Sequence, residues 1–322
     1  MSKPHSILIY ADSGDTKTTQ TYFLAKYIYE KYGLKGRIIG SNASDSAPFE
    51  QSGLIEKGVV DFFDISNRET ALGDVRKLSE GYWPRDATQG KGGPKVEKGY
   101  FKKDDNCLTT VAQWKDIGFY IIEGITGISS LLLNHIRSQE EGVGFKHSYK
   151  YEEEGYVIGG LQEGHYGLVQ QELYKVIVQG FACLPVKFII WTALTGKGED
   201  KKKNSVYGPQ GAGSANTYII PSWFMDCWHL GNEKIVGKNA KGEEVEAEIK
   251  VGWFTRHPDK DTGIEYPAKI RAMPEILPEV YKAFPKGYVR LGYKVGLDGF
   301  YKEMDKIVEG YHKEQEKGEI EK

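Results

Sequence analysis

The chain opens with a short apolar run of the kind that forms a buried strand. Residues 6–10 read SILIY, and a turn rich in Gly, Asp, Ser and Thr follows them. From Thr18 onward, apolar and aromatic residues recur near the helical spacing until Gly33, so a helix is predicted that ends at this glycine. The opening of the chain therefore reads as a strand, a loop and a helix.

Apolar runs and helical patterns continue to alternate along the chain. The further predicted elements are strands over 37–40, 59–65, 118–123 and 186–194, and helices over 69–81, 125–137 and 166–181. Strands that alternate with helices form a mainly parallel sheet with helices on its faces. The predicted fold class is α/β, with a mainly parallel central sheet flanked by helices.

Three segments depart from this alternation. Residues 82–107 are rich in Gly, Lys and Asp without periodicity, which predicts an inserted loop or hairpin. Over 218–275 the pattern changes to alternating strands around a Lys-Gly turn, which favours an antiparallel extension of the sheet. The Lys/Glu-rich residues 302–322 predict a charged helix or tail after a single domain over 1–301.

Composition and charge restrict the function classes. Of 322 residues, 39% are hydrophobic and 27% are charged, so the chain belongs to the ordinary folded class and not to the disordered one. Lys and Arg number 43 against 45 Asp and Glu, which gives a net charge of −2. This balance excludes the general basic excess of a histone-like binder, so any nucleic-acid contact must come from a local cluster.

Cysteine spacing and hydropathy bear on the compartment. Cys107, Cys183 and Cys227 are far apart and lack the paired spacing of a zinc site or a disulfide framework. We find no stretch of eighteen apolar residues and no cleavable export signal at the start. A cytoplasmic location without membrane contact is therefore expected.

The turn after the first strand carries the first candidate chemistry. Residues 11–18 read ADSGDTKT, which fits the phosphate-loop template (A/G)xxxxGK(S/T) except at Thr16. Such a loop turns backbone N–H groups toward phosphates at a helix amino terminus, Lys17 adds a charge-assisted hydrogen bond, and the Thr18 hydroxyl ligates Mg²⁺. The predicted ATP-binding residues are Ala11, Asp12, Ser13, Gly14, Asp15, Thr16, Lys17, Thr18 and Thr19.

Thr16 stands where the template has its second glycine. A β-branched residue resists a positive φ angle. The loop therefore either follows a different backbone path or adopts the glycine path with strain.

A carboxylate ends the strand predicted over 118–123. Residues 119–123 read FYIIE, and an acid at the carboxyl end of a buried strand beside a phosphate loop can hold Mg²⁺ directly or through water. Thr18 and Glu123 are thus the predicted metal ligands. The alternative is an exposed acid that merely ends a strand.

Several segments together resemble a known family. The strings IYADSGDTKTT, IIEGITGISSLL, HYGLVQQELYKVIVQGFACLPVKFIIWTAL and GPQGAGSANTYIIPSWF resemble, in this order, the conserved segments of phage-type RecA-like P-loop ATPases, a class that includes single-strand-annealing recombination proteins. The resemblance covers roughly residues 5–275. It implies a RecA-like fold, ATP and Mg²⁺ as cofactors, host cytoplasm if the protein is phage-encoded, and a polar sensor at Thr192.

The string YPAKIRAMP resembles the K-x-R element through which RecA and KaiC-type subunits reach a neighbour's nucleotide. The resemblance implies that Lys269 and Arg271 act in trans on the γ phosphate, within a homo-oligomeric ring or filament. Residues two apart in a strand face the same way, so the pair can converge on one ligand. The alternative is two solvated basic residues on an edge strand.

The loop after Leu194 contains glycines that indicate mobility, together with basic and aromatic residues. In the family that the chain resembles, the corresponding loop lines a DNA groove. Lysines neutralise phosphates and an aromatic ring stacks on a base, so single-stranded DNA is the expected partner; the alternative is a solvated charged loop. The predicted DNA-binding residues are Lys197, Lys201, Lys202, Lys203 and Tyr207.

The candidates for the catalytic base are polar residues that follow the second and third predicted strands. These are Asn42, Asp45, Asp64 and Glu69, of which Asp45 is predicted to orient the attacking water.

The expected function is Mg²⁺-dependent ATP hydrolysis coupled to single-stranded DNA in recombination or repair. Lys17, Glu123, Asp45, Thr192, Lys269 and Arg271 are the expected catalytic residues. One alternative is a non-hydrolysing nucleotide-binding subunit that uses Asp15 and Thr16 in a degraded loop. Another is a small-molecule kinase, which would carry a basic lid for its acceptor.

Overall fold

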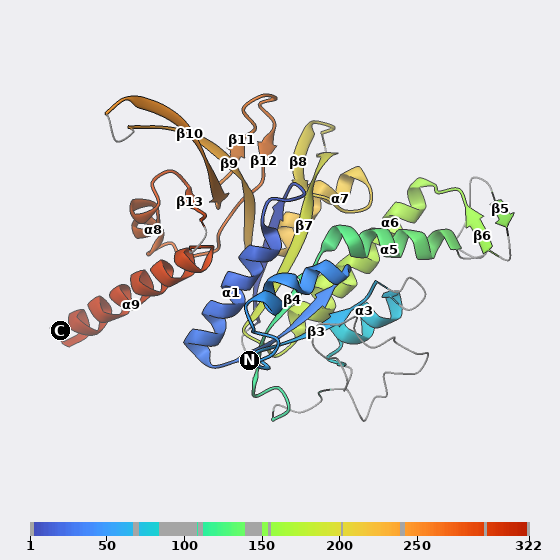
Figure 1. The fold of residues 1–322 in the computed structure, drawn as a ribbon, viewed down its shortest axis with the longest axis horizontal. Helices are drawn as coiled ribbons and strands as arrows, with labels where there is room; N and C mark the ends of the chain where they lie inside the picture. Colours follow the sequence, from blue (N-terminus) through green and yellow to red (C-terminus); the bar gives the residue numbers. More distant parts are fainter. Residues whose placement is uncertain are drawn as a thin grey trace.

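A mixed sheet forms the centre of the molecule, with helices on both of its faces (Figure 1). The computed structural model describes residues 3–66, 71–83, 108, 112–138, 150–153, 156–200, 202–238, 242–292 and 295–320. Among these residues, nine strands join this sheet in the order β13-β10-β9-β1-β7-β4-β2-β3, with β8 beside β7.

The six neighbouring strands from β9 to β3 are parallel, and β8, β10 and β13 are antiparallel to their neighbours. The bounds are β1 His5–Ala11, β2 Lys35–Gly40, β3 Val60–Asp64, β4 Ile117–Glu123, β7 Phe188–Glu199, β8 Ser205–Pro209, β9 Asp226–Lys238, β10 Glu244–Trp253 and β13 Tyr288–Arg290. Two small hairpins lie apart from it: β5 Lys150–Glu153 with β6 Tyr156–Gly159, and β11 His257–Pro258 with β12 Glu265–Tyr266.

Helices cover the two faces unequally. One face carries α1 Lys17–Tyr32, α2 Ala47–Gln51, α8 Leu277–Ala283 and α9 Asp298–Ile320. The other carries α3 Ala71–Ser79, α5 Ile125–Ser138, α6 Glu163–Tyr174 with its π-helical continuation Lys175–Gly180, and the 3₁₀ turn Ile220–Trp223 that follows α7 Ser214–Ile219. The remaining 3₁₀ turns are Ala43–Ser46 and Phe181–Cys183.

The first strand shows why its sequence is continuously apolar. Ile7 and Ile9 contact the layer formed by α1 and α9, whereas Leu8 and Tyr10 contact the layer formed by α5 and α6. All four side chains are buried, because helices cover both faces of a parallel sheet. The phosphate-loop template thus starts from a rigid central strand.

The parallel strands bring the predicted site residues to one edge. Parallel strands all end on the same side of a sheet, so the loops after β1, β2, β4 and β7 lie together. The strand β7 separates β1 from β4, and Thr192 of β7 pairs with Ile9 of β1. Glu123, the last residue of β4, pairs with Gly40 of β2.

Most of the predicted elements are confirmed. The strands predicted over 6–10, 37–40, 59–65 and 118–123 are β1 to β4, each displaced by two residues or fewer at either end. The helix predicted over 125–137 is α5, and that over 69–81 is the shorter α3. The helical pattern over 166–181 covers α6 and the π-helical turn after it.

Three expectations need correction. The strand expected to stop at Leu194 continues to Glu199 and forms a hairpin with β8. Residues 218–223, expected to begin the antiparallel extension, are helical, and β9 is parallel to β1 before it pairs antiparallel with β10. The inserted segment predicted over 82–107 lies, from residue 84 on, outside the described residues.

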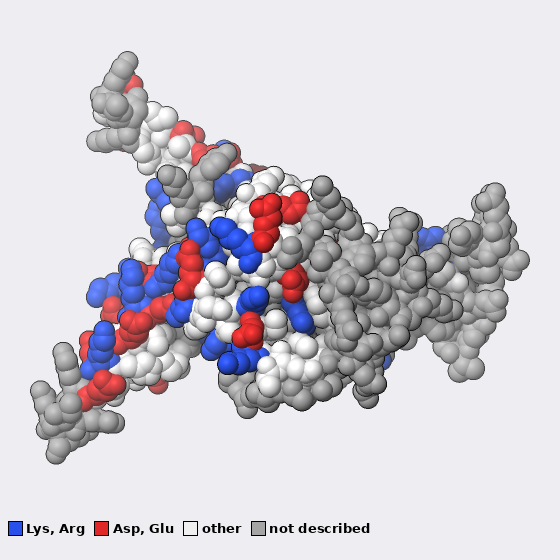
Figure 2. All heavy atoms as spheres, turned by 60° about the horizontal axis from the view of Figure 1, so that its bottom comes forward, with Lys and Arg blue, Asp and Glu red and all other residues white. Residues whose placement is uncertain are grey.

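The last helix, α9, is one element that crosses the predicted boundary between residues 301 and 302. Its first half is fixed to α1, because the Tyr27 hydroxyl donates to Asp305 Oδ2 at 2.5 Å and the Leu297 N–H donates to Gln20 Oε1 at 2.9 Å. The rest projects from the body with acidic and basic side chains intermixed (Figure 2). Within the described residues, no helix combines the length and apolar character that membrane crossing demands.

Candidate nucleotide-binding site

The loop between β1 and α1 wraps around the amino end of the helix. Gly14 has a φ of 85° and Thr16 has a φ of 60°, so both residues adopt left-handed backbone. Thr16 is the N-cap of α1, and its carbonyl accepts a hydrogen bond from the Gln20 N–H at 3.0 Å. The first N–H groups of a helix have no partner inside the helix, so this end favours a bound anion such as phosphate.

Thr16 follows the backbone path that a glycine takes without strain. Of the two outcomes expected from the sequence, the strained one is observed. Left-handed backbone costs an ordinary residue roughly 1–2 kcal/mol, and β-branching adds to that cost. The Thr16 side chain makes no capping hydrogen bond that would offset it. Strain that persists in a loop of this kind is typical of functional sites.

Lys17 lies folded across the loop. Its Nζ donates to the carbonyl oxygens of Ala11 at 3.1 Å and Asp12 at 2.7 Å. Burial lowers the pKa of Lys17, and the carboxylates of Glu123, Asp15 and Asp12 oppose that effect. A bound phosphate would replace two neutral carbonyl acceptors by a charged one, which is the stronger partner for an ammonium group.

Glu123 is the centre of a buried network. Its side chain is only 4% exposed, and three threonine hydroxyls surround it. Thr21 donates to Oε1 at 2.7 Å, Thr192 donates to Oε2 at 2.7 Å, and the Thr18 hydroxyl lies 3.5 Å from Oε2. The structure therefore brings the predicted acid, the predicted magnesium-ligating threonine and the predicted sensor of β7 into direct contact.

The burial of Glu123 has an electrostatic consequence. The pKa of Glu123 is raised to about 7 overall: burial raises it most and the nearby Asp45 acts in the same direction, whereas the hydroxyls of Thr192 and Thr21 and the charge of Lys17 lower it. A buried carboxylate without a cation in contact favours its neutral form. The site is thus prepared for a cation that would stabilise the charged carboxylate.

The donor set fits magnesium. Mg²⁺ binds proteins through one or two oxygen ligands and completes its octahedron with water and substrate phosphate. Thr18 and Glu123 supply a hydroxyl and a carboxylate oxygen beside the phosphate loop. No group of three or more His, Cys, Asp or Glu side chains suited to a metal occurs in the described part of the chain, so a metal cage made of protein alone is not formed there.

Thr21 belongs to the site although the sequence reasoning missed it. It is fully buried and lies one helical turn beyond Thr18, with its hydroxyl oxygen also 2.8 Å from the Thr18 carbonyl oxygen. Residues three and four apart share a helix face. The spacing of Lys17, Thr18 and Thr21 was therefore the available signal.

Asp45 lies in the loop after β2, where it holds the backbone. Its Oδ2 accepts the N–H groups of Ser41 and Asn42, both at 3.0 Å, as part of a capping box on the 3₁₀ turn. Burial raises the pKa of Asp45 to about 6, and these two N–H groups counteract the rise. One oxygen is thus committed to the loop, and the role of Asp45 as a base stays a prediction.

A cavity of about 690 Å³ opens beside the phosphate loop. Asp12 and Asp15 form its loop side, and Asp15 is ion-paired with Lys250 of β10. Another part of the lining is aromatic, and the sequence did not predict it. Its rings are those of His229, Trp253, His257 and Tyr266.

These rings are stacked in nearly parallel planes. His229 lies 4.0 Å from Tyr266, and Trp253 lies 4.1 Å from His257, measured between ring centroids. The Nδ1 of His229 is 2.9 Å from the Nε2 of His257. Burial lowers the pKa of His229, and His257 lowers it further, so the pair is uncharged at neutral pH. The cavity therefore has a flat aromatic side beside an anion-binding loop.

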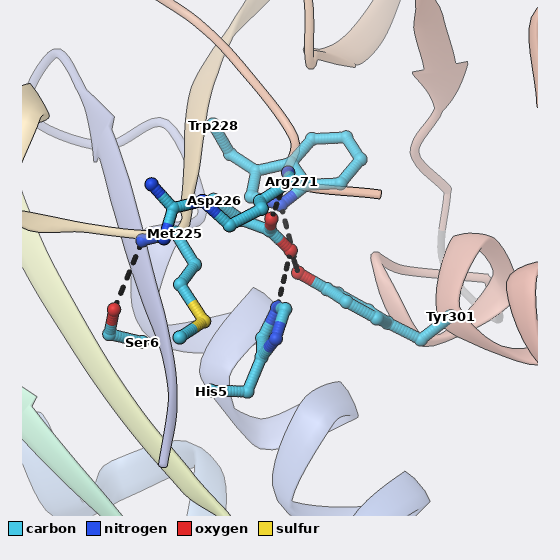
Figure 3. Close-up of polar contacts among 7 residues, drawn as sticks. All are labelled: His5, Ser6, Met225, Asp226, Trp228, Arg271 and Tyr301. Atoms are coloured by element: carbon cyan, nitrogen blue, oxygen red, sulfur yellow. Dashed lines mark hydrogen bonds and ion pairs between the residues drawn. The ribbon is translucent and has the colours of Figure 1, made fainter. Parts of the chain in front are cut away.

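Lys269 and Arg271 lie away from the phosphate loop of their own chain. Lys269 forms an isolated antiparallel bridge with Cys227, which pairs with Leu8 in the first half of β1. The Arg271 N–H donates to Asp226 Oδ1 at 2.9 Å (Figure 3). Asp226 pairs with Ile7 of β1, and the phosphate loop begins at Ala11. These four residues of strand place the loop about 13 Å farther along the sheet.

Asp226 fixes the segment that carries these two residues. Besides the Arg271 N–H, it accepts the Tyr301 hydroxyl at 2.7 Å, and His5 Nε2 lies 2.7 Å from its Oδ2 (Figure 3). These contacts join β1, β9 and α9 to the segment around Arg271. Arg271 is exposed, and this position on the surface is compatible with contact to a neighbouring subunit.

The predicted DNA-binding loop is a hairpin whose glycines serve packing. A Cβ at Gly198 would meet the Ser214 carbonyl at 2.3 Å, and one at Gly208 would meet the Thr217 carbonyl at 2.7 Å, so both glycines allow α7 to approach. The expectation that glycines make this segment mobile is therefore corrected.

The lysines predicted to bind DNA spread along that hairpin. Lys197 pairs with Tyr207 across it, Lys202 and Lys203 are exposed at its turn, and Lys201 lies outside the described residues. The ring of Tyr207 stacks on Tyr266 at 4.8 Å. The hairpin thus carries basic residues at its tip and an aromatic ring at its base.

No protein-family model and no curated protein matches this sequence. The solved structures that the chain matches include two of low similarity. The KaiC-like protein PH0186 from Pyrococcus horikoshii OT3 is 12% identical, with 83% of this chain and 91% of that chain covered and a TM-score of 0.37. The flagellar accessory protein FlaH from Methanocaldococcus jannaschii is 11% identical, with 78% and 79% covered and a TM-score of 0.31.

The fold class rests on the geometry of this chain. A phosphate-loop strand lies inside six parallel strands, and the acid that faces the loop ends a strand two positions away. Helices cover both faces, and antiparallel strands extend one edge. The predicted α/β fold class, with a mainly parallel central sheet flanked by helices and an antiparallel extension, is confirmed.

Replacing Thr16 by glycine tests the strain in the loop. Thr16→Gly should raise the free energy of unfolding by about 1 kcal/mol, because glycine adopts left-handed backbone without steric cost. Thr19→Gly, the same change inside α1, should lower it by about 0.5–1 kcal/mol. Urea unfolding of both variants measures the difference, and a loss of stability in Thr16→Gly would contradict the strain argument.

Glu123 should make stability depend on pH. Because its pKa is about 7 when folded and 4.5 ordinarily, the folded chain binds the proton more tightly. The free energy of unfolding should therefore fall as pH rises from about 4.5 to about 7, by about 3 kcal/mol, and change little from this group above that range. Glu123→Gln removes the titrating group and should abolish this part of the decline.

The comparison is made by urea unfolding of wild type and Glu123→Gln at several pH values between 5 and 8. The matched control is Glu309→Gln, which changes an exposed glutamate on α9. Wild-type and Glu123→Gln curves that run parallel across this pH range would show that Glu123 titrates normally.

Proposed function

We propose that this protein binds ATP with magnesium at the loop over residues 11–19 and hydrolyses it. The observation that carries the proposal is the contact of Thr18 with Glu123, which lie 105 residues apart in sequence and meet beside a loop built for phosphate. The raised pKa of Glu123 supports it as well, since a carboxylate that is costly to charge alone gains most from a cation. Magnesium, when bound, would neutralise charge that develops on the transferred phosphate.

Different residues of this chain would bind the phosphates, orient the carboxylate and orient the attacking water. The N–H groups at the start of α1 would hold the β and γ phosphates, with Lys17 leaving the loop carbonyls to reach them. Thr21 and Thr192 would hold the Glu123 carboxylate in place and so orient it toward the cation. Asp45 remains the proposed residue that orients the attacking water.

The cavity beside the loop is the proposed place for the base. Asp12 and Asp15 line it, and so do the stacked rings of His229, Tyr266, Trp253 and His257. A nucleobase packs favourably on aromatic faces. The phosphate loop and the aromatic side together would therefore hold the two ends of one nucleotide.

Single-stranded DNA is the proposed substrate on which turnover acts, in recombination or repair in the cytoplasm. Support comes from the exposed Lys202 and Lys203 at the hairpin tip, since such lysines neutralise phosphates without regard to sequence. The exposed Arg271 would reach the nucleotide of a neighbouring copy in a homo-oligomer. Lys269, the other residue of this pair, lines a separate cleft.

ATP turnover with and without single-stranded DNA tests the proposal. Lys17→Ala should weaken ATP binding about 10- to 100-fold and remove DNA-stimulated turnover, because it deletes a charge-assisted hydrogen bond. Lys26→Ala, which changes an exposed lysine of the same helix, should leave both unchanged.

Other outcomes separate the competing functions. ATP binding without turnover would favour the non-hydrolysing subunit over the ATPase. Full turnover by a strictly monomeric protein would refute the action of Arg271 in trans. Retention of ATP binding at wild-type affinity in Lys17→Ala would refute the site itself.

A further inference from the structure

A second cleft, of about 590 Å³, lies on the other side of the aromatic stack. It opens between β8, α7 and residues 265–269, and its lining includes Tyr207, Tyr218 and Lys269. Tyr207 lines this cleft, whereas Tyr266 lines the cavity beside the phosphate loop, and the two rings stack at 4.8 Å with 14° between their planes. The stacked tyrosines are thus part of the wall between the two spaces, and Arg256 lines both of them.

Lys269 gives this cleft an unpaired positive charge. The side chain is half-buried, and its ammonium group forms no ion pair or hydrogen bond with any described residue. The cleft lining is apolar at Pro267, Ala268 and Ile219, and it also includes the charged pair of Arg256 and Glu265, 3.8 Å apart. A partly desolvated cation without a partner favours an anionic ligand, because the ligand would restore the interactions that burial removes.

Tyr218 gives the cleft an open aromatic face. Its side chain is 44% exposed, and it makes no ring contact with any described aromatic residue. Large aromatic residues left open beside a cation are suited to stacking with a nucleobase, which contributes about 1–3 kcal/mol per base. Tyr207 offers a second ring in the lining of the cleft.

The walls of the cleft are already closely packed. The glycine at position 208 brings β8 to within contact distance of Thr217 and Pro267, so the strand, α7 and residues 265–269 are held together without a ligand. The Tyr10 hydroxyl donates to the Pro267 carbonyl at 2.8 Å, which fixes the same segment to the central strand. A preformed site loses little conformational entropy on binding.

We propose that this cleft binds one nucleotide unit of single-stranded DNA, with the base against Tyr218 and the phosphate at Lys269. The inference rests on the proposed function and adds the place where the strand is held. The same chemistry, a base with a phosphate, also occurs in a free mononucleotide. The strand is favoured because Val206 and Tyr207, which line the cleft, belong to the hairpin whose turn carries the exposed Lys202 and Lys203.

The experiment measures fluorescence anisotropy of a labelled oligothymidylate of about 15 nucleotides, at fixed low salt, with the full-length protein. Tyr218→Ala should weaken binding about 5- to 100-fold, the loss expected from one stacked base. Tyr218→Trp should bind at least as tightly as wild type, because a larger ring keeps the stacking face. Tyr281→Ala is the matched control, since that tyrosine is 45% exposed on α8, and it should not change binding.

The charge contact is tested separately. Lys269→Gln should weaken binding and should also reduce the dependence of affinity on salt by about one ion, because one phosphate contact is lost. An unchanged salt dependence in Lys269→Gln would overturn the assignment of the phosphate to this lysine.

Competition and calorimetry identify the ligand and separate this inference from the proposed ATPase. Thymidine monophosphate and inorganic phosphate should compete far more weakly than unlabelled oligothymidylate; equal competition by the mononucleotide would overturn binding of a strand in favour of a free nucleotide. If Tyr218→Ala and Tyr281→Ala bind DNA with the same affinity, the assignment of DNA binding to this cleft is overturned. If the wild-type protein binds ATP but not DNA, this inference is overturned and the proposed nucleotide site is unaffected.

Discussion

The burial of one carboxylate constrains the whole site. Glu123 is inserted among three threonine hydroxyls from α1 and β7, and these hydrogen bonds join the phosphate-loop helix, the strand β4 and the strand between β1 and β4. The arrangement leaves the carboxylate with a pKa of about 7. A group that is costly to charge but fully hydrogen-bonded is typical of a functional site rather than of a structural core. The proposal that magnesium and a triphosphate bind here follows from that constraint.

A second feature of the site also lowers the stability of the folded chain. Thr16 adopts a left-handed backbone that its side chain disfavours, at the point where the phosphate loop becomes a helix. Both features lower the stability of the folded chain, and both lie within the few residues that would contact phosphate. Natural proteins break local rules mainly where function requires it. The rigid parallel core around β1 supplies the packing that lets these local costs persist.

The sequence alone predicted the fold and the centre of the site, but not its surroundings. The loop at 11–18 and the acid at 123 were readable because each follows a continuously apolar strand, and parallel strands bring such ends together. The aromatic cavity and the second cleft were not, because their lining residues are distant in sequence and only tertiary packing brings them together. The glycines at 198 and 208 suggested mobility, whereas only the packed α7 shows that they allow close approach.

The central claim is that a magnesium-bound triphosphate binds against Glu123. Isothermal titration calorimetry with ATP and Mg²⁺ at pH 7, in two buffers of different ionisation enthalpy, tests it most directly. We expect saturable binding with release of about half a proton per site, because a carboxylate with a pKa of about 7 is half protonated before it meets the cation. No heat at millimolar ATP, or binding with the same heat in both buffers, would contradict the claim.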